Sequence, residues 1–168
     1  ALKEKEDCIM LSYQKGIVKT SVRHLVEFLF RSGDITTGSS VSANPEAMLE
    51  GSRMHRKIQR EQKATYQSEV PLKMEWNESG YKLVLEGRAD GIDWIEKEGE
   101  KLYYIDEIKC VYKNIEEIDE AEALHLAQAK CYAYLYCHRQ DLEKIGVQIT
   151  YCHLETEEIK RIFYSYTI

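Results

Sequence analysis

Apolar positions along the chain change between helical and strand spacing, which predicts a mixture of helices and strands. A short hairpin is predicted over residues 9–19, with its turn at Gly16, because glycine adopts turn conformations at little cost. A first helix should begin after Ser21, a residue type that caps helix N-termini, and end at Gly33. Its apolar residues recur at helical spacing: Val22, Leu25, Val26 and Leu29.

A polar loop over residues 34–43 separates this helix from a longer one. Asn44 and Pro45 suit the N-cap and the first helical position, and the helix is predicted to run to about residue 63. One face of this helix carries apolar and small residues together with a histidine: Ala47, Met48, Gly51, Met54, His55 and Ile58. Another side carries a basic cluster: Arg53, Arg56, Lys57, Arg60 and Lys63.

The rest of the chain alternates between strand and helix patterns. The expected elements are, in order, strands at 68–76, 81–95 and 102–111, a helix at 119–138, and strands at 144–155 and 159–168. This order predicts an α/β (α+β) domain in which a mixed central β-sheet is flanked by helices.

Composition is compatible with one folded domain, residues 1–168. At 168 residues, 43% of them hydrophobic and only 2 of them proline, the chain can bury a core without disulfides or a metal. No apolar run approaches the length of a membrane span, so no membrane partner is expected. Five cysteines without a C-x-x-C pair favour a reduced, cytoplasmic setting. The Met-less start and the apolar final strand suggest a domain cut from a longer polypeptide.

Charge narrows the functional classes. A net charge of -6 argues weakly against a passive nucleic-acid binder, whose affinity comes largely from lysine and arginine. It does not exclude an enzyme that sets carboxylates and metal ions against phosphates. The distribution is uneven, because residues 53–63 are basic and residues 115–122 hold five acids and no base.

The central chemical feature is Asp106-Glu107-Ile108-Lys109 inside a predicted strand. Side chains alternate across a strand, so Glu107 and Lys109 share one face while Asp106 and Ile108 share the other. A buried carboxylate and ammonium are costly unless they are paired or bound to something. Taken alone, however, an ordinary ion pair at a solvated strand edge is the simpler interpretation.

Two further positions carry the same ambiguity. Asp90 lies between Gly87 and Gly91, and the glycines would allow a ligand to approach the backbone closely. Alternatively, Asp90 caps its own backbone in a β-turn. His55 is a candidate ligand on the second helix, although a histidine on an apolar face is more often a hydrogen-bonded core residue.

Gln128 and Tyr132 lie four residues apart on one face of the third helix, where amphipathic packing would also account for them. The chain nevertheless resembles the PD-(D/E)xK nuclease superfamily through one ordered set of residues: Gly51-x-x-x-His55, Asp90, Glu107-x-Lys109 and Gln128-x-x-x-Tyr132. The first and last of these motifs resemble the RecB-type branch, which includes the AddB nuclease domain and CRISPR Cas-type exonucleases. Residues 21–34 and 125–134 are also similar to the nuclease domain of bacterial DinG-type (XPD-like) helicases.

The resemblance implies a restriction-endonuclease-like core and a role for each residue of the set. Asp90, Glu107 and His55 would be metal ligands, with the backbone carbonyl of Ile108 as a further ligand. Lys109 would orient or activate the attacking water. Gln128 and Tyr132 would position Lys109 and the nucleic-acid backbone. Hard oxygen ligands suit Mg²⁺ or Mn²⁺, and one imidazole tilts the choice toward Mn²⁺. Strand parity selects Glu107 over the adjacent Asp106.

The expected function is therefore a metal-dependent nuclease that hydrolyses DNA, as an exonuclease on single strands or ends in DNA repair or recombination. The alternative is a catalytically inactive DNA-binding module attached to a helicase. DNA is expected to approach along one basic set of residues: Arg53, Arg56, Lys57, Arg60 and Arg88. A solvated face that only balances nearby acids would give the same pattern.

Two other metal centres are disfavoured. Several RecB-branch members hold an iron–sulfur cluster, with one early cysteine, for which Cys8 would be the candidate, and three late ones. The late cysteines 131, 137 and 152 lack the close spacing, so we expect no cluster and treat them as core residues. A zinc site built from Cys137-His138 and Cys152-His153 is a weaker alternative, because adjacent side chains diverge.

Overall fold

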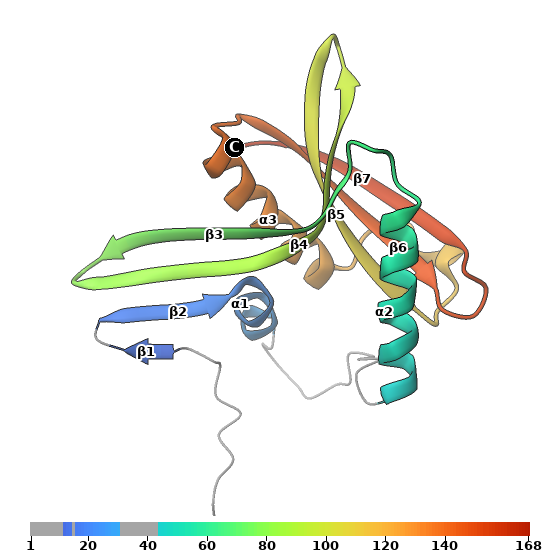
Figure 1. The fold of residues 1–168 in the computed structure, drawn as a ribbon, viewed down its shortest axis with the longest axis horizontal. Helices are drawn as coiled ribbons and strands as arrows, with labels where there is room; N and C mark the ends of the chain where they lie inside the picture. The colour runs from blue at the N-terminus through green and yellow to red at the C-terminus, as the bar shows by residue number, and fades with distance from the viewer. Residues whose placement is uncertain (1–11, 15, 31–43) are drawn as a thin grey trace, which may run out of the picture.

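The computed structural model describes residues 12–14, 16–30 and 44–168, which form one mixed sheet with helices packed against it (Figure 1). The strands are β1 (Ser12–Gln14), β2 (Ile17–Ser21), β3 (Gln67–Glu78), β4 (Tyr81–Lys97), β5 (Glu100–Val111), β6 (Lys144–His153) and β7 (Ile159–Thr167). The helices are α1 (Val22–Leu29), α2 (Pro45–Arg60) and α3 (Ala123–Gln140), with a 3-10 turn, η2, at Ile115–Glu117. The predicted class, a mixed sheet flanked by helices, is confirmed.

Most predicted element boundaries agree with the structure. Ser21 caps α1 by accepting a hydrogen bond from the His24 N–H, and Asn44 caps α2 in the same way. All three helices are shorter than predicted. Helix α1 ends at Leu29, with Phe30 as its C-cap, and not at Gly33, while α2 ends at Arg60 and α3 begins only at Ala123. The expected start of the hairpin and the loop at 34–43 lie outside the described residues. None of the described helices combines the length and apolar content of a membrane span.

Strand β4 organises the sheet because it is long enough to have different partners along its length. The strand order of the sheet is β1-β2-β4-β5-β6-β7, and β3 pairs with the other edge of β4. On the first edge, β2 pairs in parallel with residues 82–86 and β5 pairs antiparallel with residues 91–97. The four residues between these two pairings, 87–90, have no strand beside them on that edge. We call this opening the fork.

The fork forms because both neighbouring strands leave β4 there. β2 ends at Ser21, opposite Glu86, and the chain turns into α1. β5 leaves β4 beyond Asp106, opposite Gly91, and continues alongside β6 as far as Val111. Backbone groups freed in this way need other partners, so the fork is a place where side chains must complete the hydrogen bonding.

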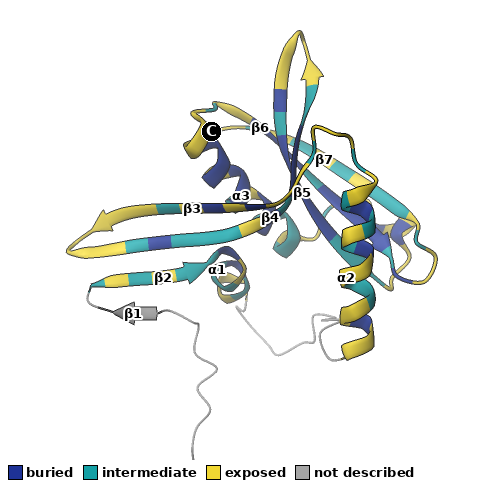
Figure 2. Cartoon of the chain, in the orientation of Figure 1, coloured by how far each residue is buried: buried dark blue, intermediate teal, exposed yellow. Residues whose placement is uncertain are grey.

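Helices cover both faces of the sheet, and strand parity decides which core each residue of β5 joins. Ile105 lies in the larger core with residues of α1 and α3, whereas Ile108 packs with Met54 and Ile58 of α2. Both isoleucines are fully buried, and Figure 2 shows a buried stretch along β5. The predicted alternation of β5 is confirmed. Met48, expected on the buried face of α2, is instead 57% exposed.

Glycines next to the fork leave room for tyrosines of the same chain, not for a ligand approaching the backbone. A Cβ at Gly87 would lie 2.7 Å from Tyr132 Cε1, and a Cβ at Gly91 would lie 1.8 Å from the Tyr66 hydroxyl oxygen. That hydroxyl donates a 2.8 Å hydrogen bond to Asp106 Oδ2. The two glycines therefore let aromatic rings pack directly on β4 beside Asp90.

We predict that Gly91→Ala destabilises the protein by about 1–3 kcal/mol, because the added methyl group must displace Tyr66 from Asp106. Urea unfolding followed by circular dichroism measures this change. Ser68→Ala is the matched control, since Ser68 is exposed and pairs directly with Gly91 across β3 and β4. Equal midpoints for Gly91→Ala and the wild type would contradict the packing of Tyr66 on β4.

Candidate active site

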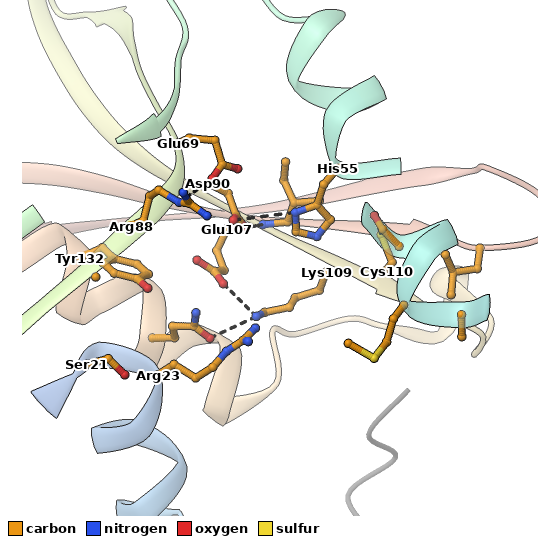
Figure 3. A pocket seen from close by; sticks show the side chains of 17 residues that line it. Ser21, Arg23, His55, Glu69, Arg88, Asp90, Glu107, Lys109, Cys110 and Tyr132 are labelled. Atoms are coloured by element: carbon orange, nitrogen blue, oxygen red, sulfur yellow. Dashed lines mark hydrogen bonds and ion pairs between the residues drawn. The ribbon is translucent and has the colours of Figure 1, made fainter. Parts of the chain in front are cut away.

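The fork opens into a cavity of about 600 Å³ that gathers every predicted catalytic and metal-ligating residue (Figure 3). Its walls come from α1, α2 and α3, and its floor comes from β4 and β5. The predicted residues that line it are His55, Asp90, Glu107, Ile108, Lys109, Gln128 and Tyr132. Segments far apart in the sequence therefore meet at one place.

Asp90 replaces the strand partner that β5 loses at the fork. Its Oδ2 accepts a 2.8 Å hydrogen bond from the backbone N–H of Ile108. In an extended strand the N–H and C=O of one residue point to the same edge, so the Ile108 carbonyl also faces the fork. The predicted carbonyl ligand and the Asp90 carboxylate thus lie on the same side of β5.

Glu107, Lys109 and Gln128 form a chain of polar contacts across the cavity. Lys109 Nζ lies 2.8 Å from Glu107 Oε1 and donates a 3.1 Å hydrogen bond to Gln128 Oε1. Glu107 is only 2% exposed, and its Oε2 is buried without a hydrogen-bond partner. In the described part of the chain, the only other such oxygen is Asp93 Oδ1. A buried carboxylate oxygen without a donor is a costly arrangement that a cation would relieve.

His55 reaches the site from α2. Its Nδ1 lies 3.8 Å from Asp90 Oδ1, and burial lowers the pKa of the imidazole, which favours the neutral form that can bind a metal. One turn further along the helix, the Gln59 side chain donates a 2.9 Å hydrogen bond to the Asp90 carbonyl. This bond ties α2 to β4 and sets how closely His55 approaches the carboxylates. Sequence reasoning missed Gln59.

The two carboxyl groups of the site hold protons more tightly than ordinary acids. Burial, together with the nearby Asp90 charge, raises the pKa of Glu107 to about 7, although Lys109 opposes both effects. Burial also raises the pKa of Asp90 to about 6, opposed by the Ile108 hydrogen bond. Two carboxylates that disfavour each other's ionisation form a site to which a divalent cation would bring compensating charge.

The ligand types at the site suit a divalent metal ion, although the side chains lie farther apart than they would around a bound ion. Carboxylate and carbonyl oxygens with one neutral imidazole are ligands for Mg²⁺ or Mn²⁺. No group of three His, Cys, Asp or Glu side chains in the described ranges is yet close enough to hold an ion. The unpartnered Oε2 of Glu107 is the observation that supports the fit, because it is a free donor atom facing a second carboxylate.

Asp106, next to Glu107 in sequence, has a different environment on the opposite side of β5. Its carboxylate accepts hydrogen bonds from Tyr66, Gln148 and Thr150, and the residue is 1% exposed. With three donors already in place, Asp106 is fully satisfied by the protein. The contrast with the incompletely satisfied Glu107 follows the parity argument made from the sequence.

Tyr132 closes the cavity from α3. Its ring lies against Gly87, and its hydroxyl makes hydrogen bonds with the Gln128 side chain and the Arg88 backbone. Burial nevertheless raises the pKa of this phenol, so it stays protonated near neutral pH. Tyr132 thus supports Gln128, which in turn contacts Lys109.

The predicted basic face is divided in the structure. Arg53 forms ion pairs with Glu50 and Glu157, and Lys57 also pairs with Glu157, so these cations are already balanced. In the part of the chain that is described, Arg56 and Arg60 are exposed and have no such partner. Of the predicted basic residues, Arg88 alone lines the cavity, where it pairs with Glu69 at 2.6 Å.

One cation at the cavity was missed by the sequence reasoning. Arg23 extends from α1 toward Lys109 (Figure 3), and its only ion pair within the described ranges is a loose one of 3.9 Å to Glu27. The sequence shows that Arg23 lies two residues after the Ser21 cap, but the fork that brings it to the cavity depends on the pairing of distant strands.

The alternative zinc interpretation has no geometric support. Cys137 is buried in the core, and Cys152 packs with α2. His153 uses both ring nitrogens locally, because Nε2 contacts the Tyr112 carbonyl and Nδ1 accepts from the Glu155 and Thr156 N–H groups. Cys131, also predicted to be a core residue, is only partly buried. Cys8, the candidate early cluster ligand, lies outside the described residues.

Comparison with known proteins gives a family and a fold. The model of the family described as the PD-(D/E)XK nuclease superfamily matches residues 16–165. A solved structure described as the crystal structure of SSO0001 is 18% identical, with a TM-score of 0.60, over 94% of this chain and 71% of the other. That likeness shows a shared fold. No curated protein matches the chain.

We predict that Glu107→Gln makes the metal-free protein more stable than the wild type at pH 8. The folded state keeps protons on Glu107 and Asp90 that the unfolded chain has lost, so their contribution to stability falls as the pH rises from about 4 to 7. The amide of the variant does not ionise, so it avoids the loss of stability that Glu107 causes at high pH. The difference in stability between Glu107→Gln and the wild type should shrink toward pH 4. Thermal melting with EDTA measures it.

The exposed Glu120→Gln is the control for a simple loss of negative charge. It should leave the melting temperature of the metal-free protein nearly unchanged at both pH values. A Glu107→Gln variant that is less stable than the wild type at pH 8 would mean that the ion pair with Lys109 outweighs the burial of the carboxylate.

Proposed function

The chain belongs to the PD-(D/E)XK nuclease superfamily, and from this premise we propose that it hydrolyses phosphodiester bonds of DNA at the fork in a reaction that depends on a divalent metal ion. Superfamily members generally use ions such as Mg²⁺. The observation that carries the proposal is the buried, unpartnered Glu107 Oε2 opposite Asp90, beside a lysine that is held in place by Gln128.

We infer that Asp90, Glu107, His55 and the Ile108 carbonyl would hold the ion. When bound, it would polarise a phosphoryl oxygen, lower the pKa of a water molecule and stabilise the leaving oxygen. His55 makes Mn²⁺ an acceptable alternative to Mg²⁺. Glu107 could bind the ion and Lys109 at the same time, because Lys109 contacts its Oε1 and its Oε2 has no partner.

Lys109 contributes the second part of the chemistry. Its ammonium group is anchored by Glu107 and Gln128, so it would face the phosphate without needing to reorganise. In hydrolysis, the water oxygen forms a new bond to phosphorus while the bond from phosphorus to the leaving oxygen breaks. Lys109 would orient that water and stabilise the negative charge that develops on the phosphate.

The form of the substrate is also part of the proposal. A cavity of about 600 Å³ between α1 and α2 has room for a nucleotide or two, which supports single strands or strand ends over an intact duplex. Arg23 and Arg88 line the same cavity and would contact neighbouring phosphates. We therefore favour a RecB-type exonuclease acting in DNA repair or recombination, with a helicase as a candidate partner in the same polypeptide.

An inactive DNA-binding module is the second candidate, and one observation favours it. The described residues contain no ready-made cluster of three metal-ligating side chains, and Lys109 already neutralises part of Glu107. Cleavage of a 5′-labelled single-stranded oligonucleotide that requires Mg²⁺ or Mn²⁺, and stops with EDTA, would support the enzyme. Binding without cleavage under every divalent ion tested would support the module.

We predict that Glu107→Gln lowers the cleavage rate at least about 100-fold while the protein stays folded, because the amide cannot hold the ion. Asp106→Asn should instead destabilise the fold by about 1–3 kcal/mol, since the amide nitrogen cannot accept a hydrogen bond that the carboxylate oxygen now accepts. Below its melting temperature, Asp106→Asn should keep cleavage within about tenfold of wild type. Oligonucleotide cleavage and thermal melting, measured on both variants, test this; reversed phenotypes would exchange the two roles.

We also predict that the two unpaired arginines of α2 guide DNA. Replacing Arg56 and Arg60 by glutamine should reduce the slope of log affinity against log salt by about 1.4 for a single strand, at about 0.7 per lost phosphate contact. Replacing Arg53 and Lys57 should change the slope less, because Glu157 already balances them. Fluorescence anisotropy in EDTA across a salt series measures both. Identical slopes for the wild type and both double variants would exclude this face.

A further inference from the structure

One glycine in the described part of the chain has no structural explanation within the protein itself. Three of the seven described glycines adopt positive φ in turns, namely Gly16, Gly80 and Gly99. Three others leave room for aromatic side chains, namely Gly87, Gly91 and Gly146. Gly51 belongs to neither group. It is helical, and a Cβ built on it would have nothing within 4 Å in the described residues.

The position of Gly51 makes this absence informative. It lies inside α2, one turn before His55, and lines the cavity at the fork. Glycine is among the least favourable residues in a helix interior, so alanine would be the better choice for stability alone. Among the described residues, none fills the space that a side chain at residue 51 would occupy at the cavity.

The two ends of the cavity differ in chemistry. Next to Gly51 the lining includes Ala47 and Met48, about one turn away on α2, and Cys110, whose thiol contacts the Gly51 carbonyl, and Leu154 is a further apolar lining residue. Met48 is 57% exposed, so its side chain is accessible to a ligand. The opposite end carries the charged groups: Arg23, Arg88, Glu107 and Lys109. One cavity thus joins a surface that suits a phosphate to a surface that suits an apolar ring or sugar.

We propose that the space over Gly51 is a subsite for a nucleoside of the substrate strand, the one joined to the phosphate that lies at Lys109. This inference rests on the proposed function and adds to it where the sugar and base are placed. A nucleotide has this division, with a charged phosphate and a flat, weakly polar base. The missing side chain lets the nucleoside pack on the α2 backbone next to Met48.

The test compares Gly51→Ala and Gly51→Leu with the wild type and with Ser52→Ala, an exposed position on the same turn. Gly51→Ala should melt at the same or a higher temperature than the wild type, because alanine favours the helix. It should nevertheless bind a 5′-labelled single-stranded oligothymidylate about threefold to tenfold more weakly, and Gly51→Leu should bind more than tenfold more weakly. Ser52→Ala should match the wild type in binding.

Binding is measured by fluorescence anisotropy in EDTA, and cleavage is measured separately with Mg²⁺ or Mn²⁺. If the wild type binds but never cleaves, the proposed function fails, while weaker binding by the Gly51 variants still supports the subsite. If the wild type binds and cleaves, and both Gly51 variants match it in affinity and kcat/KM while remaining folded, the subsite is overturned. If the wild type neither binds nor cleaves the strand, the subsite falls together with the proposed function.

Discussion

The hydrogen bond from the Ile108 N–H to the Asp90 carboxylate is the contact on which the site depends. It lies where β5 leaves β4, and it supplies the backbone partner that the sheet no longer provides. Because Asp90 is held there, its second oxygen faces His55. Lys109, the residue after Ile108 on β5, lines the same cavity. A structural need of the sheet and the placement of a candidate metal ligand are met by one side chain.

Electrostatics at the fork oppose stability in the metal-free protein. Burial raises the pKa of both Glu107 and Asp90, the Asp90 charge adds to the rise at Glu107, and Lys109 compensates only in part. Residues around the site are satisfied in other ways, as Asp106 is by its three donors. Destabilising charge thus gathers at the residues that would hold an ion, which is the pattern expected where function and not folding selects the residues.

Much of the site was predictable from the sequence because strand parity and helix caps are local properties. The face shared by Glu107 and Lys109, the caps of α1 and α2, and the order of the motifs all follow from neighbouring residues. The fork itself does not, since it depends on where β2 and β5 leave β4, and this is decided by pairing between distant strands. Within the described residues, it is the fork that brings Arg23 and Gln59 to the site.

The same limit explains two of the corrected expectations, those for the glycines and for the basic face. Gly87 and Gly91 look from the sequence like glycines that admit a ligand, but Tyr132 and Tyr66 reach them from other elements. The basic face of α2 looks continuous, but Glu157, from the turn between β6 and β7, neutralises Arg53 and Lys57. Contacts between residues distant in sequence decide both cases, and no local pattern records them.

The most direct test of the account is a crystal structure of the protein soaked with Mn²⁺, with anomalous diffraction used to locate the ion. We expect one anomalous peak at the fork, about 2.0–2.3 Å from an Asp90 oxygen, from Glu107 Oε2 and from the Ile108 carbonyl oxygen. Lys109 should remain in contact with Gln128. A protein that binds Mn²⁺ elsewhere, or that shows no peak between Asp90 and Glu107 at saturating Mn²⁺, would contradict the proposed metal site.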